Sequence, residues 1–504
     1  MVDLLIHYMA PIMFASLVVF LLLGYPVAFS LAANGLIFGW IGIELGLFRP
    51  EFLQALPERV YGVMNNDTLL AVPFFTFMGL ILERSGMAED LLDTIGQLFG
   101  TIRGGLAYAV IFVGALLAAT TGVVAASVIS MGLISLPIML RYGYDRRVAS
   151  GVIAASGTLA QIIPPSLVLI VMADQLGRSV GDMYEGAFVP GLVLALLYAT
   201  YVFGVSILFP KATPGLPVDA IGYREPDGAR GVWQLGVLVL FSGVVAYYEM
   251  MQTNVKPGAD FVVLTMSIGV LVALLCAVFN RLFGARRVWL TALAVAAFAA
   301  LWWHLKETNH ANWALLAEAL AFGAFYALVA GLLERFTGFR LVTAMAEQTT
   351  FVMVPPLALI FLVLGTIFIG LATPTEGGAM GAAGAVLLAL FKKRLKWDLL
   401  KQATESTAKL SSFVIFILIG ARVFSLTFYG VSGHRWVEEL LVSLPGGQLG
   451  FLIFVNLFVF FLAFFLDFFE IAFIVIPLLG PAAERLGIDL IWFGVILGVN
   501  MQTS

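Results

Sequence analysis

The sequence carries little charge for its length. Charged residues make up 12% of the 504 positions, whereas a soluble domain usually has about 25%. Hydrophobic residues make up 61%, and the mean hydropathy is +1.02. A soluble fold could not hide that much apolar surface, so the composition excludes an ordinary soluble globular protein.

Cysteine and histidine are scarce. The single cysteine, Cys276, excludes disulfides within the chain and a thiolate metal cluster. It lies in the apolar run VLVALLCAVFN, where we expect a small residue of the core or of the lipid-facing surface. The four histidines, His7, His304, His310 and His434, are scattered without ligand spacing. The sequence therefore supports neither a metal centre nor a haem site.

Several function motifs are also missing. The sequence contains no phosphate-binding loop, nucleophile elbow or zinc motif. It has no long basic tract, and its net charge is −4, so we expect no nucleic acid partner. Without a phosphate-binding loop, this chain is not expected to drive transport with ATP.

Apolar stretches near the length of a membrane span recur along the whole chain. The first stretch lacks the basic start and cleavage site of a secretory signal, so it is predicted to be a retained transmembrane helix. Pro73 and Gly79 interrupt LLAVPFFTFMGLILE (69–83), which we interpret as part of a re-entrant hairpin. The predicted segments lie near 9–24, 26–43, 69–83, 105–119, 122–140, 148–173, 187–209, 233–252, 259–279, 287–305 and 313–333, and a further series runs from 351.

The beginning and end of the chain resemble each other. Pro137 and Pro481 are each followed by a glycine six residues later and an aspartate eight residues later, at an offset of 344. EDLL at 89 similarly precedes EELL at 438 by 349 residues. These offsets predict repeats over 1–210 and 347–504, separated by a polar linker and four-helix insertion over 211–346.

Loop charge indicates that the repeats are inverted. The loop 391–401 carries five basic residues, whereas its counterpart 43–53 has one arginine and two glutamates. Conversely, RYGYDRR at 141–147 is basic and ERLGID near 484–489 is not. Because basic short loops favour the cytoplasmic side, matched loops are predicted on opposite sides. Inverted repeats with interrupted helices are typical of secondary transporters.

Two helix breaks in the first repeat carry groups suited to a cation site. TTGVVAASVISMG offers Thr121, Gly122 and Ser127, whose hydroxyl and backbone oxygens could surround sodium, although helix packing through small residues would explain them equally well. SGTLAQIIPPS contains tandem prolines that remove two backbone donors. In this segment Gly157, Thr158 and Gln161 are candidate cation ligands, and Pro164 and Pro165 are candidate substrate contacts. A simple proline kink is the alternative.

The second repeat offers further candidates. LATPTEGGAMG places Thr373 and Thr375 at a helix start, where a threonine cap with Glu376 in the first turn is the favoured structural interpretation. FFLDFFE places Asp467 and Glu470 in an apolar run. Because a carboxylate at membrane depth is costly, we interpret both as candidate functional residues. A position at the membrane interface is the alternative for Asp467. Arg422 could attract an anionic substrate or extend to the lipid interface.

At these motifs the chain resembles the large membrane subunit of tripartite ATP-independent periplasmic (TRAP) transporters. The resemblance rests on AVPFFTFMGLILERSG, on the run from TTGVVAASVISMG to TLAQIIPPS, on GAFVPGL, on GTIFIGLATPTEGGAMGA and on GVNMQTS. It covers most of 1–210 and 350–504.

The resemblance implies an elevator-type carrier that takes up organic acids, often carboxylates, with sodium as the coupling ion and no other cofactor. Substrate-binding residues would then be Pro164, Pro165, Thr373, Thr375 and Arg422, and sodium would be held by Thr121, Gly122, Ser127, Gly157, Thr158, Gln161, Asp467 and Thr503. The implied partners are a small four-helix membrane subunit, a periplasmic substrate-binding protein and the lipid bilayer of a bacterial or archaeal inner membrane. Two hairpins and two broken helices of the mobile domain would lie near 65–83, 120–137, 405–428 and 467–481.

The chain departs from the family pattern in two places. The stretch 230–346 adds four predicted helices, which could brace the scaffold, or replace or contact the small subunit. At Ser504 the sequence ends inside an apolar helix, although the repeat offset predicts prolines at 508 and 509, so the second repeat is expected to be truncated. Two other classes remain as alternatives, namely a membrane-embedded enzyme using Asp467 and Glu470, and an ion channel.

Overall fold

The computed structural model describes residues 6–121, 124–222, 231–251, 258–283, 287–308 and 311–503. These residues form helices joined by turns, and no β-strand occurs among them. Nine of the described helices are long and apolar enough to cross a membrane, or up to 11 if each of two bent pairs forms one span. The expected all-α polytopic membrane fold is confirmed.

The helices of the first 210 residues begin and end within a few residues of most predicted segments. The apolar helix nearest the N-terminus has 14 residues and is therefore shorter than the nine candidate spans. These helices are α2 (Met9–Leu22), α3 (Val27–Glu44), α4 (Leu56–Met64), α5 (Ala71–Arg84), α6 (Met87–Phe99), α7 (Gly105–Thr121), α8 (Val124–Arg141), α9 (Arg146–Thr158), α10 (Leu167–Leu176) and α11 (Val180–Leu208).

The rest of the chain contains the four inserted helices and a second series. The insertion comprises α12 (Val232–Met251), α13 (Ala259–Phe283), α14 (Val288–Glu307) and α15 (Ala311–Thr337). The second series comprises α16 (Ala344–Phe368), α17 (Pro374–Phe391), α18 (Trp397–Gly430), α19 (Gly433–Val442), α20 (Gly447–Leu462), α21 (Phe468–Ile474), α22 (Ile476–Arg485) and α23 (Leu490–Asn500).

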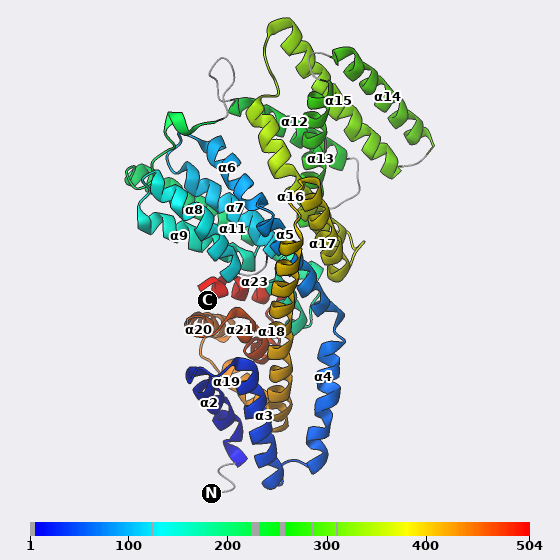
Figure 1. Ribbon diagram of the computed structural model, residues 1–504. Coiled ribbons are helices and arrows are strands. Elements are labelled where there is room, and N and C mark those ends of the chain that lie inside the picture. The colour runs from blue at the N-terminus through cyan, green and yellow to red at the C-terminus, as the bar shows by residue number, and fades with distance from the viewer. Residues whose placement is uncertain are drawn as a thin grey trace.

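The molecule is elongated (Figure 1), with α2, α3 and α4 at one end and the inserted helices at the other. Helix α18 runs along the long direction between these ends, and α7, α8, α9 and α11 lie to one side. In the insertion, α13 packs against α16 and α11, while α14 packs mainly against α15. The insertion therefore contacts the rest of the protein chiefly through α13.

The prediction of a hairpin or broken helix at 405–428 is wrong. These residues lie within α18, one continuous helix of 34 residues. The segment contains no proline to remove a backbone donor. Its Gly420 serves close packing instead, because a methyl group there would lie 2.4 Å from the Ala28 carbonyl oxygen of α3.

The segment 69–83, predicted as part of a re-entrant hairpin, forms one arm of a bent helix pair. It forms α5, and the pair Pro50–Met64 and Asp67–Arg84 bends by 45° at a short break. A bent pair of this kind fits a broken span or a re-entrant loop, so the hairpin stays a prediction. Pro73 lies in the first turn of α5, where a missing N–H costs little because that group has no partner within the helix.

Positions matched by the sequence offsets have similar local structures. Gly143 and Gly487 both adopt positive φ, at +84° and +73°. Two residues later, Asp145 and Asp489 cap α9 and α23 by accepting hydrogen bonds from backbone N–H groups. The EDLL and EELL motifs lie on α6 and α19. Each end of the chain therefore uses the same turn and cap at corresponding positions.

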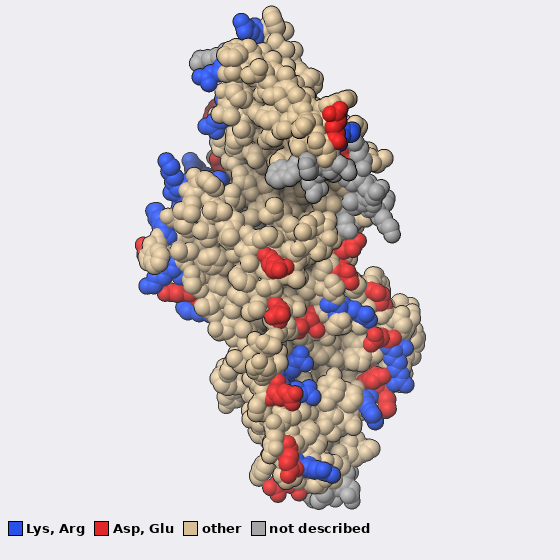
Figure 2. Space-filling view, turned by 90° about the vertical axis from the view of Figure 1, so that its right-hand side faces the viewer, with Lys and Arg blue, Asp and Glu red and all other residues tan. Residues whose placement is uncertain are grey.

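Much of the surface has the character of a lipid-facing protein. In Figure 2 the charged side chains leave broad uncharged areas between them. On α11, Leu196, Phe203 and Leu208 are 66%, 57% and 73% exposed. Apolar surface of this extent is expected where lipid replaces water.

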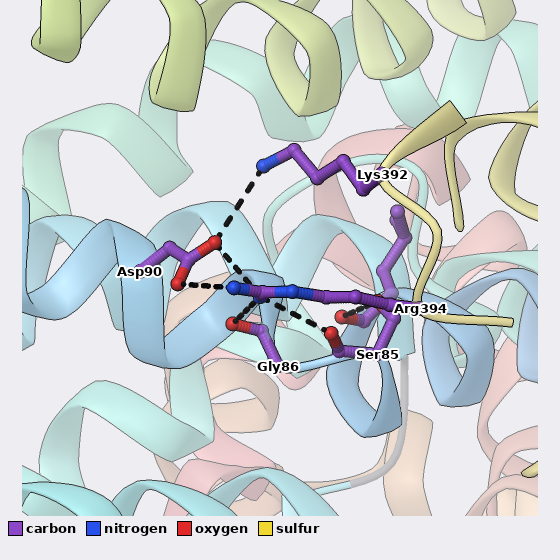
Figure 3. Close-up of polar contacts among 6 residues, drawn as sticks. Ser85, Gly86, Asp90, Lys392 and Arg394 are labelled. Atoms are coloured by element: carbon purple, nitrogen blue, oxygen red, sulfur yellow. Dashed lines mark hydrogen bonds and ion pairs between the residues drawn. The ribbon is translucent and has the colours of Figure 1, made fainter. Parts of the chain in front are cut away.

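The basic loop after α17 is joined to the start of α6 (Figure 3). The guanidinium group of Arg394 lies 2.8 Å from Asp90 Oδ2 and donates to the Gly86 carbonyl at 3.0 Å. The Lys392 ammonium group lies 3.7 Å from the same carboxylate. Burial lowers the pKa of Lys392, while the negative charge of Asp90 opposes that shift. This contact links two segments about 300 residues apart in sequence.

Candidate functional site

The tandem prolines break a helix, as their sequence predicts. Helix α9 ends at Thr158, a short 3₁₀ turn (η3) covers Leu159–Gln161, and α10 starts at Leu167. The residues between the two helices are buried, and Gln161 is only 2% exposed. The break therefore places the end of α9 and the start of α10 in the protein interior.

Side chains hold the interrupted backbone in place. The Ser166 hydroxyl donates to the Gln161 carbonyl at 2.8 Å, across the two prolines. The hydroxyl of Tyr184 on α11, which is fully buried, donates to the Ser166 carbonyl at 3.3 Å. These bonds satisfy carbonyl groups that a continuous helix would have paired.

The start of α8 lies directly against the end of α9. A methyl group on Gly157 would lie 2.3 Å from Val128 Cγ2 and 3.1 Å from the Val128 backbone. A methyl group on Gly114 of α7 would similarly lie 2.6 Å from the Ser156 β-carbon. Small residues thus allow α7, α8 and α9 to approach closely, and they bring buried Ser127 near Gly157.

The other end of the chain reaches the same region. The 3₁₀ turn Met501–Thr503 (η6) packs against η3. The Tyr198 hydroxyl on α11 donates to Gln502 Oε1 at 3.0 Å and also hydrogen-bonds with the Thr158 side chain. The structure therefore brings together the elements that carry Ser127, Gly157, Thr158, Gln161 and Thr503, although 376 residues separate the first from the last.

Some candidate ligands cannot be placed in full. Gly122 lies outside the described residues. Thr121 ends α7 and Thr503 lies in η6, but the positions of both side chains fall outside what the structure describes.

Asp467 is a helix cap in this structure. Its carboxylate accepts a hydrogen bond from Phe468 N at 2.7 Å, and Asp467 N donates to Glu470 Oε2 at 3.0 Å. Together the two residues form a capping box at the start of α21. Helix α21 packs against α10, the helix that follows the proline break.

Thr373 and Thr375 likewise lie at a helix start. Thr373 and Glu376 form a capping box on α17, which is the structural interpretation favoured by the sequence. The Thr375 hydroxyl donates to the Asp67 carbonyl at 2.7 Å, joining α17 to the turn before α5. Pro164 and Pro165 are buried in the break itself.

Arg422 lies in the second half of α18 and is half-buried. Its neighbours Val423 and Phe424 pack against Gly35 of α3. None of the ion pairs among the described residues involves its guanidinium group. An unpaired cation in an apolar helix can attract an anion or extend toward water.

Sequence reasoning missed three polar side chains, Tyr184, Tyr198 and Glu83. Tyr184 and Tyr198 bond to the break and to η6, but single tyrosines in an apolar helix give no spacing signal. The Ser130 hydroxyl on α8 donates to the carboxylate of Glu83 on α5. Glu83 could have been noticed, because it ends an apolar stretch and carboxylates there are costly.

Comparison with known proteins identifies the family. A sequence profile described as "Tripartite ATP-independent periplasmic transporter, DctM component" matches residues 14–504. The chain belongs to this family. The resemblance noted from the motifs is therefore confirmed, and with it the assignment to a transporter component and not an enzyme.

Individual relatives span different parts of the chain. A C4-dicarboxylate TRAP transporter large permease protein of Rhodobacter capsulatus is 25% identical over 98% of this chain and 86% of its own length. A protein of the same description from Pseudomonas aeruginosa is 32% identical over 39% of this chain and 46% of its own length. An ectoine TRAP transporter large permease protein of Halomonas elongata is 29% identical over 47% of this chain and 54% of its own length.

Proposed function

We propose that this chain is the large membrane subunit of a sodium-coupled importer of a small organic acid. The observation that carries the proposal is the meeting of α8, the end of α9, η3 and η6 around one buried helix break. Freed carbonyl groups and hydroxyl side chains are good ligands for a hard cation such as sodium.

The direction of the helix ends suits this assignment. The end of α9 presents the negative end of its dipole to the break. The start of α10 presents N–H groups, which attract an anion such as a carboxylate. Cation ligands would therefore come from Ser127, Gly157, Thr158 and Gln161, and the acid would lie nearer Pro165.

Relatives support an organic acid as the substrate. The Rhodobacter capsulatus and Pseudomonas aeruginosa proteins are named for C4-dicarboxylates, and the Halomonas elongata protein is named for ectoine. An isethionate permease protein of Oleidesulfovibrio alaskensis, named DctMQ, is 20% identical over 97% of this chain and 57% of its own length. We propose a small anionic or zwitterionic acid for this chain.

The transport movement we propose is of the elevator type, between inverted repeats. Matched turns and caps at Gly143, Asp145, Gly487 and Asp489 support the repeats. Helix pairs support the repeats as well. Helix α3 of the first repeat packs on α18 of the second, and α17 of the second repeat packs on α5 of the first, so the two packed pairs correspond. Inverted repeats give a carrier two related conformations, facing opposite sides of the membrane.

The remaining assignments follow from the tripartite description of the family. We propose a small four-helix membrane subunit and a periplasmic substrate-binding protein as partners. We place the complex in the inner membrane of a bacterium or archaeon, with sodium as the coupling ion.

Uptake by proteoliposomes tests this function. The protein, with its small subunit and binding protein, should accumulate a labelled C4-dicarboxylate or a related acid only with an inward sodium gradient. Gln161→Ala should raise the sodium concentration for half-maximal uptake about tenfold, because removing one buried oxygen partner costs about 1–1.5 kcal/mol.

A matched pair of threonines separates coordination from helix packing. The hydroxyls of Thr158 and Thr200 each donate to a backbone carbonyl of their own helix, but only Thr158 lies at the break. Thr158→Val should weaken sodium dependence, and Thr200→Val should not. Sodium-independent uptake by the unaltered protein, or equal sodium affinity in all variants, would contradict the assignment.

A further inference from the structure

An apolar groove of about 570 Å³ lies among α5, α17 and α18, away from the helix break. Its walls include Phe74 and Phe77 of α5, Ala383 and Val386 of α17, and Thr404 and Thr407 of α18. All three helices belong to apolar segments long enough, alone or as a bent pair, to cross a membrane. The α5 and α17 walls therefore lie in apolar segments, whereas the α18 wall lies in the more polar first turns of that helix, as expected for a groove near the membrane interface.

One end of the groove lies near residues typical of a membrane interface. There α17 ends at Phe391 and α18 begins at Trp397, and these side chains are 82% and 77% exposed. The loop between them is basic, which favours the cytoplasmic side. Residues Val386 and Thr404 lie within about two turns of these helix ends, so the groove starts near the interface.

The basic side chains of the loop and of the start of α18 have different partners. Lys392 and Arg394 are held by Asp90 (Figure 3) and face α6. Lys401 lies about one turn before Thr404 on a neighbouring part of the same face of α18. Its contact with Glu405 is 4.0 Å long, and both side chains are more than half exposed. Lys401 therefore remains available to a negative group at the mouth of the groove.

A polar group also lies inside the groove. Thr407 is 8% exposed, and its hydroxyl oxygen has no hydrogen-bond partner among the described residues. A buried hydroxyl without a partner costs free energy. The hydroxyl would gain a partner from the ester carbonyl of a lipid whose chain fills the groove.

We propose that this groove binds an acyl chain of an anionic phospholipid, with the lipid headgroup held at Lys401. The apolar walls fit the chain, and the ammonium group complements the phosphate charge. This site is independent of the transport function proposed above.

Native mass spectrometry of the purified chain tests the site. The protein would be supplied with equal amounts of phosphatidylglycerol and phosphatidylcholine that carry identical acyl chains. We expect retained phosphatidylglycerol to exceed phosphatidylcholine. Lys401→Gln should reduce that preference about five-fold, as expected for one lysine at a lipid surface. Lys409→Gln is the matched control, because Lys409 lies on the opposite face of α18 from Thr407.

A second variant addresses the groove itself. Ala383 is exposed at the groove wall, so Ala383→Phe should fill the groove without disturbing the core and should release both lipids. Equal retention of the two lipids by the unaltered protein would overturn the proposal, and so would unchanged lipid binding by Ala383→Phe. Two other outcomes would also contradict the proposal. If Ala383→Phe lost self-association, a second copy of the chain would be the occupant of the groove. If inorganic phosphate displaced the bound lipid, Lys401 would belong to a simple anion site.

Discussion

Among the described glycines that pack around the helix break, Gly157 leaves the least room for a β-carbon. A methyl group at this position would lie 2.3 Å from Val128 Cγ2 and 3.1 Å from the Val128 backbone. Val128 follows Ser127 in the first turns of α8. The position of the candidate cation ligands therefore depends on a space that a larger residue would close.

Gly157→Ala tests this dependence. The variant should lose about 1–3 kcal/mol of stability, since the added group can be accommodated only if α8 and α9 move apart. The melting temperature in detergent, followed by tryptophan fluorescence, would report the loss. Uptake should fall as well, because the displacement separates Ser127 from the break.

Gly151 provides the control on the same helix. It lies two turns earlier in α9, and a methyl group there would meet nothing within 4 Å. Gly151→Ala should leave uptake unchanged and stability equal or slightly higher, because alanine favours a helix by about 0.5–1 kcal/mol over glycine. If the two variants lost stability equally, close packing at Gly157 would not explain the effect.

At the scale of elements, the loop between α17 and α18 is joined to α6 through one carboxylate. Asp90 faces Arg394 at 2.8 Å, and these side chains are 29% and 41% exposed. Arg394 also donates to the carbonyl groups of Ser85 and Gly86, between the end of α5 and the start of α6. The contact therefore holds a helix junction as well as an ion pair.

A double-mutant cycle on Asp90→Asn and Arg394→Gln measures this contact. We expect a coupling free energy of about 0.5–1 kcal/mol, because the pair is partly shielded from water and its geometry is close. Unfolding in denaturant would supply the four stabilities. The pair Lys401 and Glu405, at 4.0 Å and with both side chains more than half exposed, should show coupling near zero. Equal coupling in both pairs would argue against a structural role for Asp90.

At the scale of the whole molecule, the proposed inverted repeats predict which loops face opposite sides of the membrane. Arg49 follows α3, and Lys396 precedes α18 in the corresponding part of the second repeat. Cys276 is fully buried, so the unaltered chain should react little with a thiol reagent.

Arg49→Cys and Lys396→Cys should therefore be labelled from opposite sides by a membrane-impermeant maleimide. In right-side-out vesicles the periplasmic position should react, and in inverted vesicles the cytoplasmic one should react. By loop charge, we expect Lys396 on the cytoplasmic side and Arg49 on the periplasmic side. Labelling of both positions from one side would contradict inverted repeats.

Most elements, and the family, could be predicted from the amino-acid sequence. Length and apolar composition predicted the spans, because a helix that crosses hydrocarbon satisfies its own backbone groups locally. The tandem prolines predicted the break between α9 and α10, and the Thr373 motif predicted its cap, since these effects act within a few residues. Motif spacing was sufficient to indicate the TRAP family.

Which of these elements meet became visible in the three-dimensional arrangement. The sequence could not show that α18 is continuous, because the interruption expected at 405–428 depended on a family resemblance and not on a local helix-breaking residue. Nor could it place η6 against η3, or identify Tyr184 and Tyr198 as partners of the break. Those contacts join separate elements, from 18 positions apart for Tyr184 and Ser166 to 304 for Tyr198 and Gln502. Packing between helices, which local sequence patterns do not record, determines them.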